Sequence, residues 1–248
     1  MVKISNPNAI LNGYDIEFPT KGFIKTYYNI SLSNLDDVKL GCPSFLSKSK
    51  SGTPFSQIPN LVGFDVPVKV KTQSFDVRGT IAILGQDALR DPYDNYLNGI
   101  NTNKYIVVGL PYAIAFDNNY KQVSVYHNLI KDILDSGYDV YLTDIWKSWD
   151  KNNDSRLGNW ITNNPHKECL GDEFSGDVQI DFIVLMGGIA QKKFKSVIHS
   201  ESIIEVPVPH LSPMANGKWG ELVGKPVTED KKIKYVKDEL KKKGVHIL

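Results

Sequence analysis

Residues 80–87 have the sequence Thr-Ile-Ala-Ile-Leu-Gly-Gln-Asp, and this stretch decides the class of fold. Its first five residues form an uninterrupted apolar and β-branched run, which is typical of a strand buried on both faces of a parallel sheet. Gly85 predicts a turn directly after Leu84, so we expect the strand to end there and to present Gln86 and Asp87 beyond its end. A strand of this kind predicts an α/β protein with helices on both faces of the sheet.

Strand and helix patterns alternate on the C-terminal side of this run. Apolar residues recur at helical spacing over 122–136, and Gly137 follows where a helix commonly stops. A second helix is expected from Gly187-Gly188 to about residue 195. Further strands of this sheet are expected at 139–143, 180–186 and 203–208, and residues 104–108 are a candidate for an additional strand. This order predicts a three-layer α/β/α architecture around a central, mostly parallel, four-stranded sheet.

The length and composition of the chain predict one domain. With 248 residues, of which 41% are hydrophobic and 23% charged, the chain can bury a sizeable core without dividing. We expect a single domain over 1–248, with a motif-bearing core at about 75–220 and helical or loop additions at 1–74 and 221–248. A helix is expected at 31–38.

The sequence contains no pattern typical of export, a membrane span or a metal site. It has no run of about 18 apolar residues and does not begin with a secretory pattern, so we expect a cytoplasmic or nucleoid-associated protein without a membrane partner. Its two cysteines, Cys42 and Cys169, lie far apart in the sequence and predict neither a metal centre nor an iron–sulfur cluster. No cofactor is expected.

The charge of the chain gives no general bias toward nucleic acid. The formal net charge is +1 and the pI is about 7.7, so any affinity for DNA has to come from a local patch. The lysine-rich stretch 230–244 is predicted to be a helix with a solvated charged face, because Ile233, Val236 and Leu240 recur at helical spacing. Thr228 is its expected N-cap.

Four polar or glycine positions directly follow predicted strands: Asp87, Asp144, Gly187 and His210. In open α/β sheets, ligands bind beyond the carboxyl ends of the strands, where loops from several strands converge. These four positions are therefore expected to lie together at one edge of the sheet and to form a pocket.

Two motifs, at residues 84–87 and 209–214, resemble those of the uracil-DNA glycosylase superfamily. Leu84-Gly85-Gln86-Asp87 resembles the GQDP-type turn, and Pro209-His210-Leu211-Ser212-Pro213-Met214 resembles the HPSP-type loop. Between them, Gly109-Leu110-Pro111-Tyr112-Ala113-Ile114 is similar to the segment that carries a base-stacking aromatic ring. Residues 185–193 are similar to the strand-to-helix turn of the superfamily, so the resemblance spans about residues 80–220.

The resemblance implies a monofunctional DNA glycosylase, in which water rather than a lysine attacks the sugar. Asp87 would position the water and stabilise an oxocarbenium-like sugar, and His210 would donate a hydrogen bond to the departing base. The base-binding candidates are Gln86, Tyr112, Asp144 and Leu89. The DNA-binding candidates are Ser212, Met214, Lys218 and Gly187, with Met214 entering the space that the flipped base leaves. The implied partner is single- or double-stranded DNA, bound by a monomer through a local patch.

The chain departs from the superfamily pattern at the residues that select the base. Asp87 is followed by Ala88 and Leu89, where the superfamily has the Pro and Tyr that exclude thymine, whereas Asp-Pro-Tyr occurs at 91–93. Asp91 is therefore an alternative to Asp87 as the carboxylate that activates water. Asp144 stands where the superfamily has an Asn that reads uracil. An ionised Asp144 would only accept hydrogen bonds and would suit an exocyclic amine such as that of cytosine, whereas a protonated Asp144 would imitate the amide.

These departures leave two other functions open. The first is a superfamily member that binds DNA or nucleotides with little or no glycosylase activity. The second is a hydrolase of nucleosides or free nucleotides, which the near-neutral charge of the chain favours. Release of a free base from an oligonucleotide separates the glycosylase from both.

Overall fold

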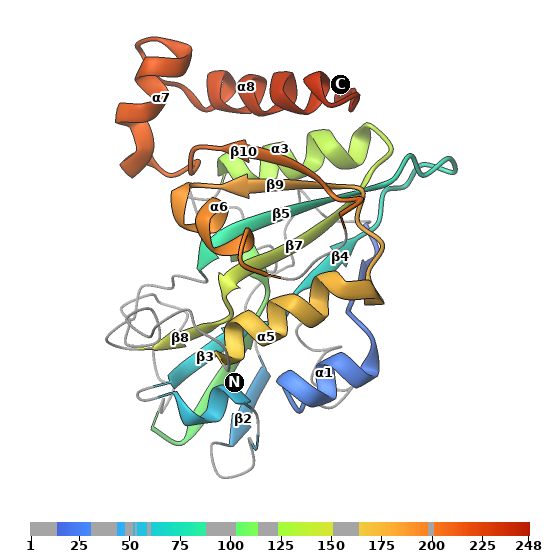
Figure 1. The fold of residues 1–248 in the computed structure, drawn as a ribbon, viewed down its shortest axis with the longest axis vertical. Helices are drawn as coiled ribbons and strands as arrows, with labels where there is room; N and C mark the ends of the chain where they lie inside the picture. The colour runs from blue at the N-terminus through green and yellow to red at the C-terminus, as the bar shows by residue number, and fades with distance from the viewer. Residues whose placement is uncertain are drawn as a thin grey trace.

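The computed structural model describes residues 14–30, 44–47, 52, 54–58, 61–87, 103–113, 124–150, 164–197 and 201–248 (Figure 1). The described strands form two sheets. The larger sheet contains, in spatial order, β1 (Ile16–Glu17), β4 (Val68–Val70), β7 (Asp139–Trp146), β5 (Thr80–Asp87), β9 (Phe182–Met186) and β10 (Ile204–Val208). The smaller sheet contains β2 (Ser44–Ser47), β6 (Tyr105–Gly109), β3 (Leu61–Asp65) and β8 (Ser148–Asp150).

The larger sheet confirms the expected α/β class, but it has six described strands and mixed strand directions. Strand β5 is parallel to β7 and β9, and β10 is parallel to β9. The two additional strands, β4 and β1, pair in antiparallel fashion beside β7. The sheet is therefore larger than the four-stranded sheet that the sequence predicts, because the chain before residue 75 adds strands to its edge.

Strand β5 runs further than predicted. Gly85 lies in register with Asp144, and Asp87 lies in register with Trp146 of β7. The expected turn at Gly85 is wrong, because β7 continues to Trp146 and supplies paired backbone groups to the last residues of β5. Asp87 is consequently the final residue of a strand.

The N-terminal part of the chain contains more strand than expected. Helices and loops were predicted for 1–74, whereas β1 to β4 all lie within this range and α1 (Lys21–Tyr27) is its described α-helix. The strand predicted at 104–108 is present as β6, and it pairs with β2 and β3 in the smaller sheet. The helix predicted at 31–38 lies outside the described residues.

Helices cover both faces of the larger sheet (Figure 1). On one face, α3 (Ser124–Asp135) packs against β7 and α8 (Glu229–Lys242) packs against β10, while α5 (Pro165–Asp172) and α6 (Gly188–Phe194) pack on the other face. Side chains alternate along β5, so that Ile81 and Ile83 join one buried cluster and Ala82 and Leu84 join the other. The remaining short helices are η2 (Pro54–Gln57), η3 (Pro111–Ala113), the π-helix η4 (Glu173–Asp177), η5 (Pro213–Ala215) and α7 (Asn216–Val223).

The C-terminal helix α8 has the predicted N-cap, but one of its lysines is buried and not solvated. The side chain of Thr228 accepts a hydrogen bond from the backbone N–H of Lys231, as expected of an N-cap. Lys232 does not belong to a solvated face, because only 5% of its surface is exposed. No helix within the described ranges is both long enough and apolar enough to cross a membrane.

Candidate functional site at the carboxyl edge of the sheet

The carboxyl ends of the four parallel strands point to one end of the larger sheet, where α6 and α7 also lie (Figure 1). Asp87 ends β5, Asp144 lies near the end of β7, Gly187 follows β9 and His210 follows β10. The structure thus places the four predicted positions at the same edge of the sheet.

Gly85, Asp144 and Tyr112 are in close contact at this edge. A Cβ atom on Gly85 would collide with Oδ1 of Asp144 and would lie 2.7 Å from the hydroxyl oxygen of Tyr112. Asp144 is buried, with 3% of its surface exposed. The Tyr112 hydroxyl also lies 3.4 Å from the carbonyl oxygen of Ile83. Glycine at position 85 therefore makes room for the two polar groups that the sequence assigns to base recognition.

Tyr112 has an unusual backbone conformation. Its φ of 57° and ψ of 19° lie in the left-handed region, which is an outlier for a bulky side chain. The carbonyl oxygen of Tyr112 lies 3.4 Å from Nε2 of the buried His127, and since a carbonyl can only accept, His127 donates this hydrogen bond. Burial lowers the pKa of His127, which favours the neutral ring. His127 thus holds the strained residue through its carbonyl oxygen, a contact that no pattern in the sequence predicted.

Hydrogen bonds around His210 define which ring nitrogen carries the proton. The backbone N–H of Ser212 donates to Nδ1 at 3.3 Å, and the Ser212 hydroxyl lies 2.8 Å from the same nitrogen. Because a backbone N–H can only donate, Nδ1 has to act as an acceptor, and the ring proton is on Nε2. His210 is therefore arranged as a neutral imidazole with an N–H donor on Nε2.

The loop that carries His210 is held by side chains from three helices. Trp219 of α7 donates from Nε1 to the carbonyl oxygen of His210 at 2.9 Å, and Lys232 of α8 donates to that of Leu211 at 2.8 Å. Gln191 of α6 donates to the carbonyl oxygen of Val208 at 2.9 Å. No pattern in the sequence predicted these three contacts. For Lys232 a signal was present, because it adjoins Ile233 and lies four residues before Val236 on the apolar face of α8.

Gly187 adjoins the same loop. Its φ is 89°, and a Cβ atom there would lie 3.2 Å from Cβ of His210. Glycine allows both the left-handed backbone and the close approach of the two loops.

The other predicted site residues that the structure describes differ in their exposure to solvent. Gln86 is partly buried on β5, Met214 on η5 is 97% exposed, and Lys218 is exposed on α7. Leu89 and Asp91 lie outside the described residues. For Asp87 the backbone is described as the end of β5, and its side chain lies outside the described part.

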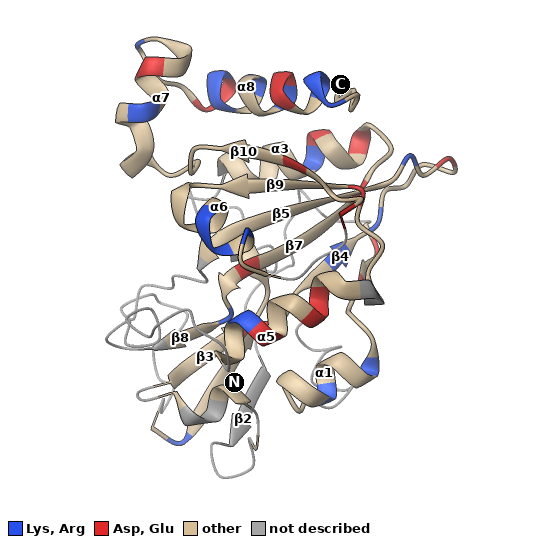
Figure 2. Ribbon diagram, viewed as in Figure 1, with Lys and Arg blue, Asp and Glu red and all other residues tan. Residues whose placement is uncertain are grey.

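Basic side chains are present on the helices beside this edge. Figure 2 shows lysines on α6 at the carboxyl end of the sheet, whereas α7 and α8 carry both signs of charge. Lys193 of α6 lies over the Trp146 ring, with Nζ 5.5 Å from its centroid. Within the described residues, no group of three or more His, Cys, Asp or Glu side chains is arranged to hold a metal ion.

A second polar cluster is buried on the opposite face of β7. Lys147 forms an ion pair with Glu173, at 2.5 Å, and contacts the hydroxyl of Thr143. Its backbone N–H donates to Nδ1 of His166 at 3.2 Å. Thr143 and Asp144 are successive strand residues and point to opposite faces, so this cluster is separate from the candidate site. Its position between β7 and β8 indicates that it joins the two sheets.

The buried His166 predicts a loss of stability in mild acid. Burial, followed by the charge of Lys147, lowers its pKa from 6.5 to about 3. Below pH 6.5 the unfolded chain binds a proton at His166, whereas the folded protein does so only near pH 3. The free energy of unfolding is therefore unaffected by this residue above pH 6.5 and decreases as the pH falls toward 3. Between pH 7 and pH 5 we expect the wild-type free energy of unfolding to fall by about 2 kcal/mol through this residue. Urea titrations should show that this loss is absent in His166→Gln; an equal loss in the variant would contradict the assignment.

Gly85→Ala is expected to lower the free energy of unfolding by about 1–3 kcal/mol, because the new methyl group collides with Asp144 and Tyr112. Urea denaturation measures the change. Gly188→Ala is the matched control, since nothing lies within 4 Å of its added Cβ, and it should change stability by less than about 1 kcal/mol. Equal stability of the two variants would show that Gly85 is not closely packed.

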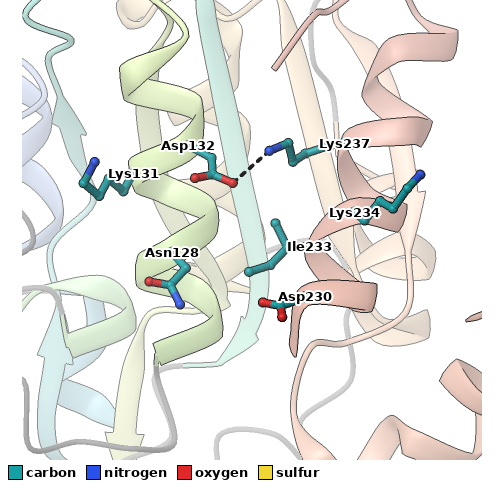
Figure 3. Close-up of a pocket in the computed structure, with 7 residues that line it drawn as sticks. All are labelled: Asn128, Lys131, Asp132, Asp230, Ile233, Lys234 and Lys237. Atoms are coloured by element: carbon teal, nitrogen blue, oxygen red, sulfur yellow. Dashed lines mark hydrogen bonds and ion pairs between the residues drawn. The ribbon is translucent and has the colours of Figure 1, made fainter. Parts of the chain in front are cut away.

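A groove of about 370 Å³ lies between α3 and α8 (Figure 3). Its lysines are paired with carboxylates: Lys131 with Asp135, Lys234 with Asp238 and Lys237 with Asp132. The groove therefore offers little uncompensated charge to a ligand.

No protein-family model matches the sequence, and a search of curated proteins finds no significant match.

Proposed function

We propose that the protein is a monofunctional DNA glycosylase that hydrolyses the N-glycosidic bond of a deaminated or modified base flipped out of DNA. The observation that carries this proposal is the convergence of His210, Tyr112 and Asp144 on one edge of the sheet, with His210 arranged as a neutral Nε2–H donor. The motifs around Asp87 and His210 resemble those of the uracil-DNA glycosylase superfamily. The four adjacent parallel strands support a framework similar to that of the superfamily.

The proposed reaction uses water as the nucleophile. As the bond between C1′ and the base nitrogen breaks, its electron pair leaves with the base, and positive charge develops on the sugar. Asp87 stabilises that charge and accepts the proton of the water whose oxygen bonds to C1′. His210 donates its Nε2 hydrogen bond to the developing negative charge on a base oxygen. Tyr112 stacks on the flipped base, and Gln86, Asp144 and Leu89 define the rest of its pocket.

The proposed DNA contacts are made by residues of the His210 loop, of α7 and of the turn before α6. Ser212, Lys218 and the backbone of Gly187 would contact phosphates, and these contacts position the strand without reading its sequence. A monomer is sufficient for this arrangement, and its affinity for DNA should fall steeply with salt, because phosphate contacts release counterions. The cytoplasm or the nucleoid is the proposed location.

Met214→Ala is expected to slow base release from duplex DNA about tenfold, with a much smaller effect on single-stranded DNA. The Met214 side chain is almost completely exposed, which suits a wedge that fills the space of the flipped base. Unstacking and unpairing cost a few kcal/mol in a duplex and less in a single strand. Single-turnover assays on both substrates check the difference, and Leu222→Ala, an exposed apolar residue of α7, is the control. Equal losses on both substrates would argue against a wedge.

The decisive experiment is a panel of labelled oligonucleotides containing U, T, C and common base lesions, in single- and double-stranded form. The proposal expects release of at least one free base. Absence of product from the whole panel would exclude the glycosylase. The alternative function, a module that binds DNA or nucleotides with little turnover, is favoured by Asp144 at the position that should read the base. Binding of the panel without cleavage would support it.

A further inference from the structure

Helix α6 carries positive charge without acidic neighbours in its own segment. Lys192, Lys193 and Lys195 lie within the helix and its C-cap, and the sequence has no Asp or Glu between residues 182 and 200. Among the residues that the structure describes, neither Lys192 nor Lys195 forms an ion pair. On α8, by contrast, acidic side chains alternate with the lysines and form ion pairs within the same helix (Figure 2).

The side chains of Lys192 and Lys195 lie on the solvent side of α6. Ala190 and Phe194 form its buried side, whereas both lysines are exposed. Residues three apart are neighbours on a helix surface, so the two ammonium groups share one exposed side. The helix macrodipole favours lysines in the last turn, but two like charges side by side repel each other. An anion that contacts both lysines would relieve this repulsion.

The third lysine extends the positive charge to the ends of the strands. Nζ of Lys193 lies 5.5 Å from the centroid of the Trp146 ring, and Trp146 is in register with Asp87 at the end of β5. Burial, followed by the charge of Lys192, lowers the pKa of Lys193. Positive charge therefore reaches from the exposed side of α6 to the carboxyl edge of the sheet.

Helix α6 begins beside the loop that carries His210. Gly187 directly precedes the helix, and a Cβ atom on Gly187 would lie 3.2 Å from Cβ of His210. With a rise of about 1.5 Å per residue, Lys192 and Lys195 lie about 8 and 12 Å from Gly187 along the helix axis. One strand of duplex DNA advances about 3.4 Å per nucleotide, so these distances correspond to about two to four nucleotides.

We propose that Lys192 and Lys195 bind phosphates of the DNA strand a few nucleotides from the flipped base, which makes α6 a further DNA-contact surface beside the His210 loop and α7. This inference rests on DNA being the substrate, as in the proposed function. Phosphate contacts carry no sequence information, so α6 holds damaged and undamaged DNA alike. Lys193 adds to the positive potential between this surface and the candidate site.

The test compares the salt dependence of DNA binding by the wild type and by Lys192→Gln/Lys195→Gln. Fluorescence anisotropy of labelled oligonucleotides without any modified base measures the affinity between about 50 and 200 mM salt. Each phosphate contact contributes about 0.9 to the slope of log K against log salt on duplex DNA and about 0.7 on a single strand. We therefore expect the slope to become shallower by about 1.8 on duplex DNA and about 1.4 on a single strand, and the affinity at low salt to fall about tenfold or more.

The charge-matched control is Lys241→Gln/Lys243→Gln. These lysines are exposed at the end of α8, and the chain beyond them contacts Ser136, which precedes the amino end of β7. The control removes the same charge far from the carboxyl edge, and it should keep the slope of the wild type. Urea denaturation checks that both double variants are folded.

The outcomes separate this surface from the proposed function. Equal changes of slope in the two double variants indicate a general effect of net charge and overturn the role of α6. An unchanged affinity and slope in Lys192→Gln/Lys195→Gln overturn it as well, because the two lysines then serve only the helix. A wild type that binds DNA but releases no base from the oligonucleotide panel overturns the glycosylase and not this surface. A wild type that binds no DNA at low salt overturns both.

Discussion

Replacing His210 with alanine is expected to lower the single-turnover rate of base release about 100- to 1,000-fold, which is the usual cost of removing one donor to a developing anion. The expectation follows from the tautomer: Ser212 donates to Nδ1, so Nε2 carries the proton that the proposed reaction uses as a donor to the base. The carbonyl oxygen of residue 210 keeps its hydrogen bond from Trp219, so the loop should retain its position. Circular dichroism and urea denaturation check that the variant is folded.

Ser212→Ala is the matched control for His210→Ala. It removes the hydroxyl that lies 2.8 Å from Nδ1 but keeps the backbone N–H that fixes the tautomer. We expect a loss of less than about tenfold, close to the value of one neutral hydrogen bond. A loss below tenfold in His210→Ala itself would contradict its role as the donor. Normal DNA binding by His210→Ala, with no product from either protein, would instead favour the binding module.

Local patterns predicted the elements that place the site. The apolar run of β5, the helical period of α3 and the position of Gly137 after it all correspond to the structure, because each depends on neighbours in the sequence. The alternation of strands and helices then placed Asp144, Gly187 and His210 at one edge. The extra strands beside β7 were not predictable in this way, since β1 and β4 are short and their pairing depends on a distant strand.

The supports of the site depend on contacts between distant segments and were not visible in the sequence. Lys232 was expected on a solvated helix face, yet Lys232 and Trp219 both donate to backbone carbonyls of the His210 loop. His127 follows Tyr126 in the first turn of α3 and contacts a carbonyl fifteen residues earlier. A lysine or histidine inside an apolar period indicates a buried polar group that needs a partner, but the pattern does not say which partner.

Under the proposed function, the identity of the base would depend mainly on Asp144, and the environment of this residue limits how it can act. Its side chain is buried beside Gly85 and the Tyr112 hydroxyl, so a base in the pocket would meet it with little intervening water. In a buried site, two hydrogen-bond acceptors that face each other cost binding free energy, because neither can hydrogen-bond to water instead. An ionised Asp144 accepts from the amine of a cytosine-type base and opposes the O4 oxygen of uracil.

Asp144→Asn is therefore expected to shift the preference from cytosine-type bases toward uracil by about 100-fold, within the range for one hydrogen-bonded pair that reads a base. The two side chains have nearly the same shape, so the contact with Gly85 should survive while one oxygen becomes an N–H₂ donor. Ratios of single-turnover rates on the two bases measure the shift. Asp139→Asn, at the other end of β7, is the control; it alters the carboxylate that pairs with Lys69 and should leave the ratio unchanged. An unchanged ratio in Asp144→Asn would mean either that Asp144 is protonated and already imitates the amide, or that it does not touch the base. Uracil separates these two cases, because a protonated Asp144 predicts efficient release of uracil by the wild type.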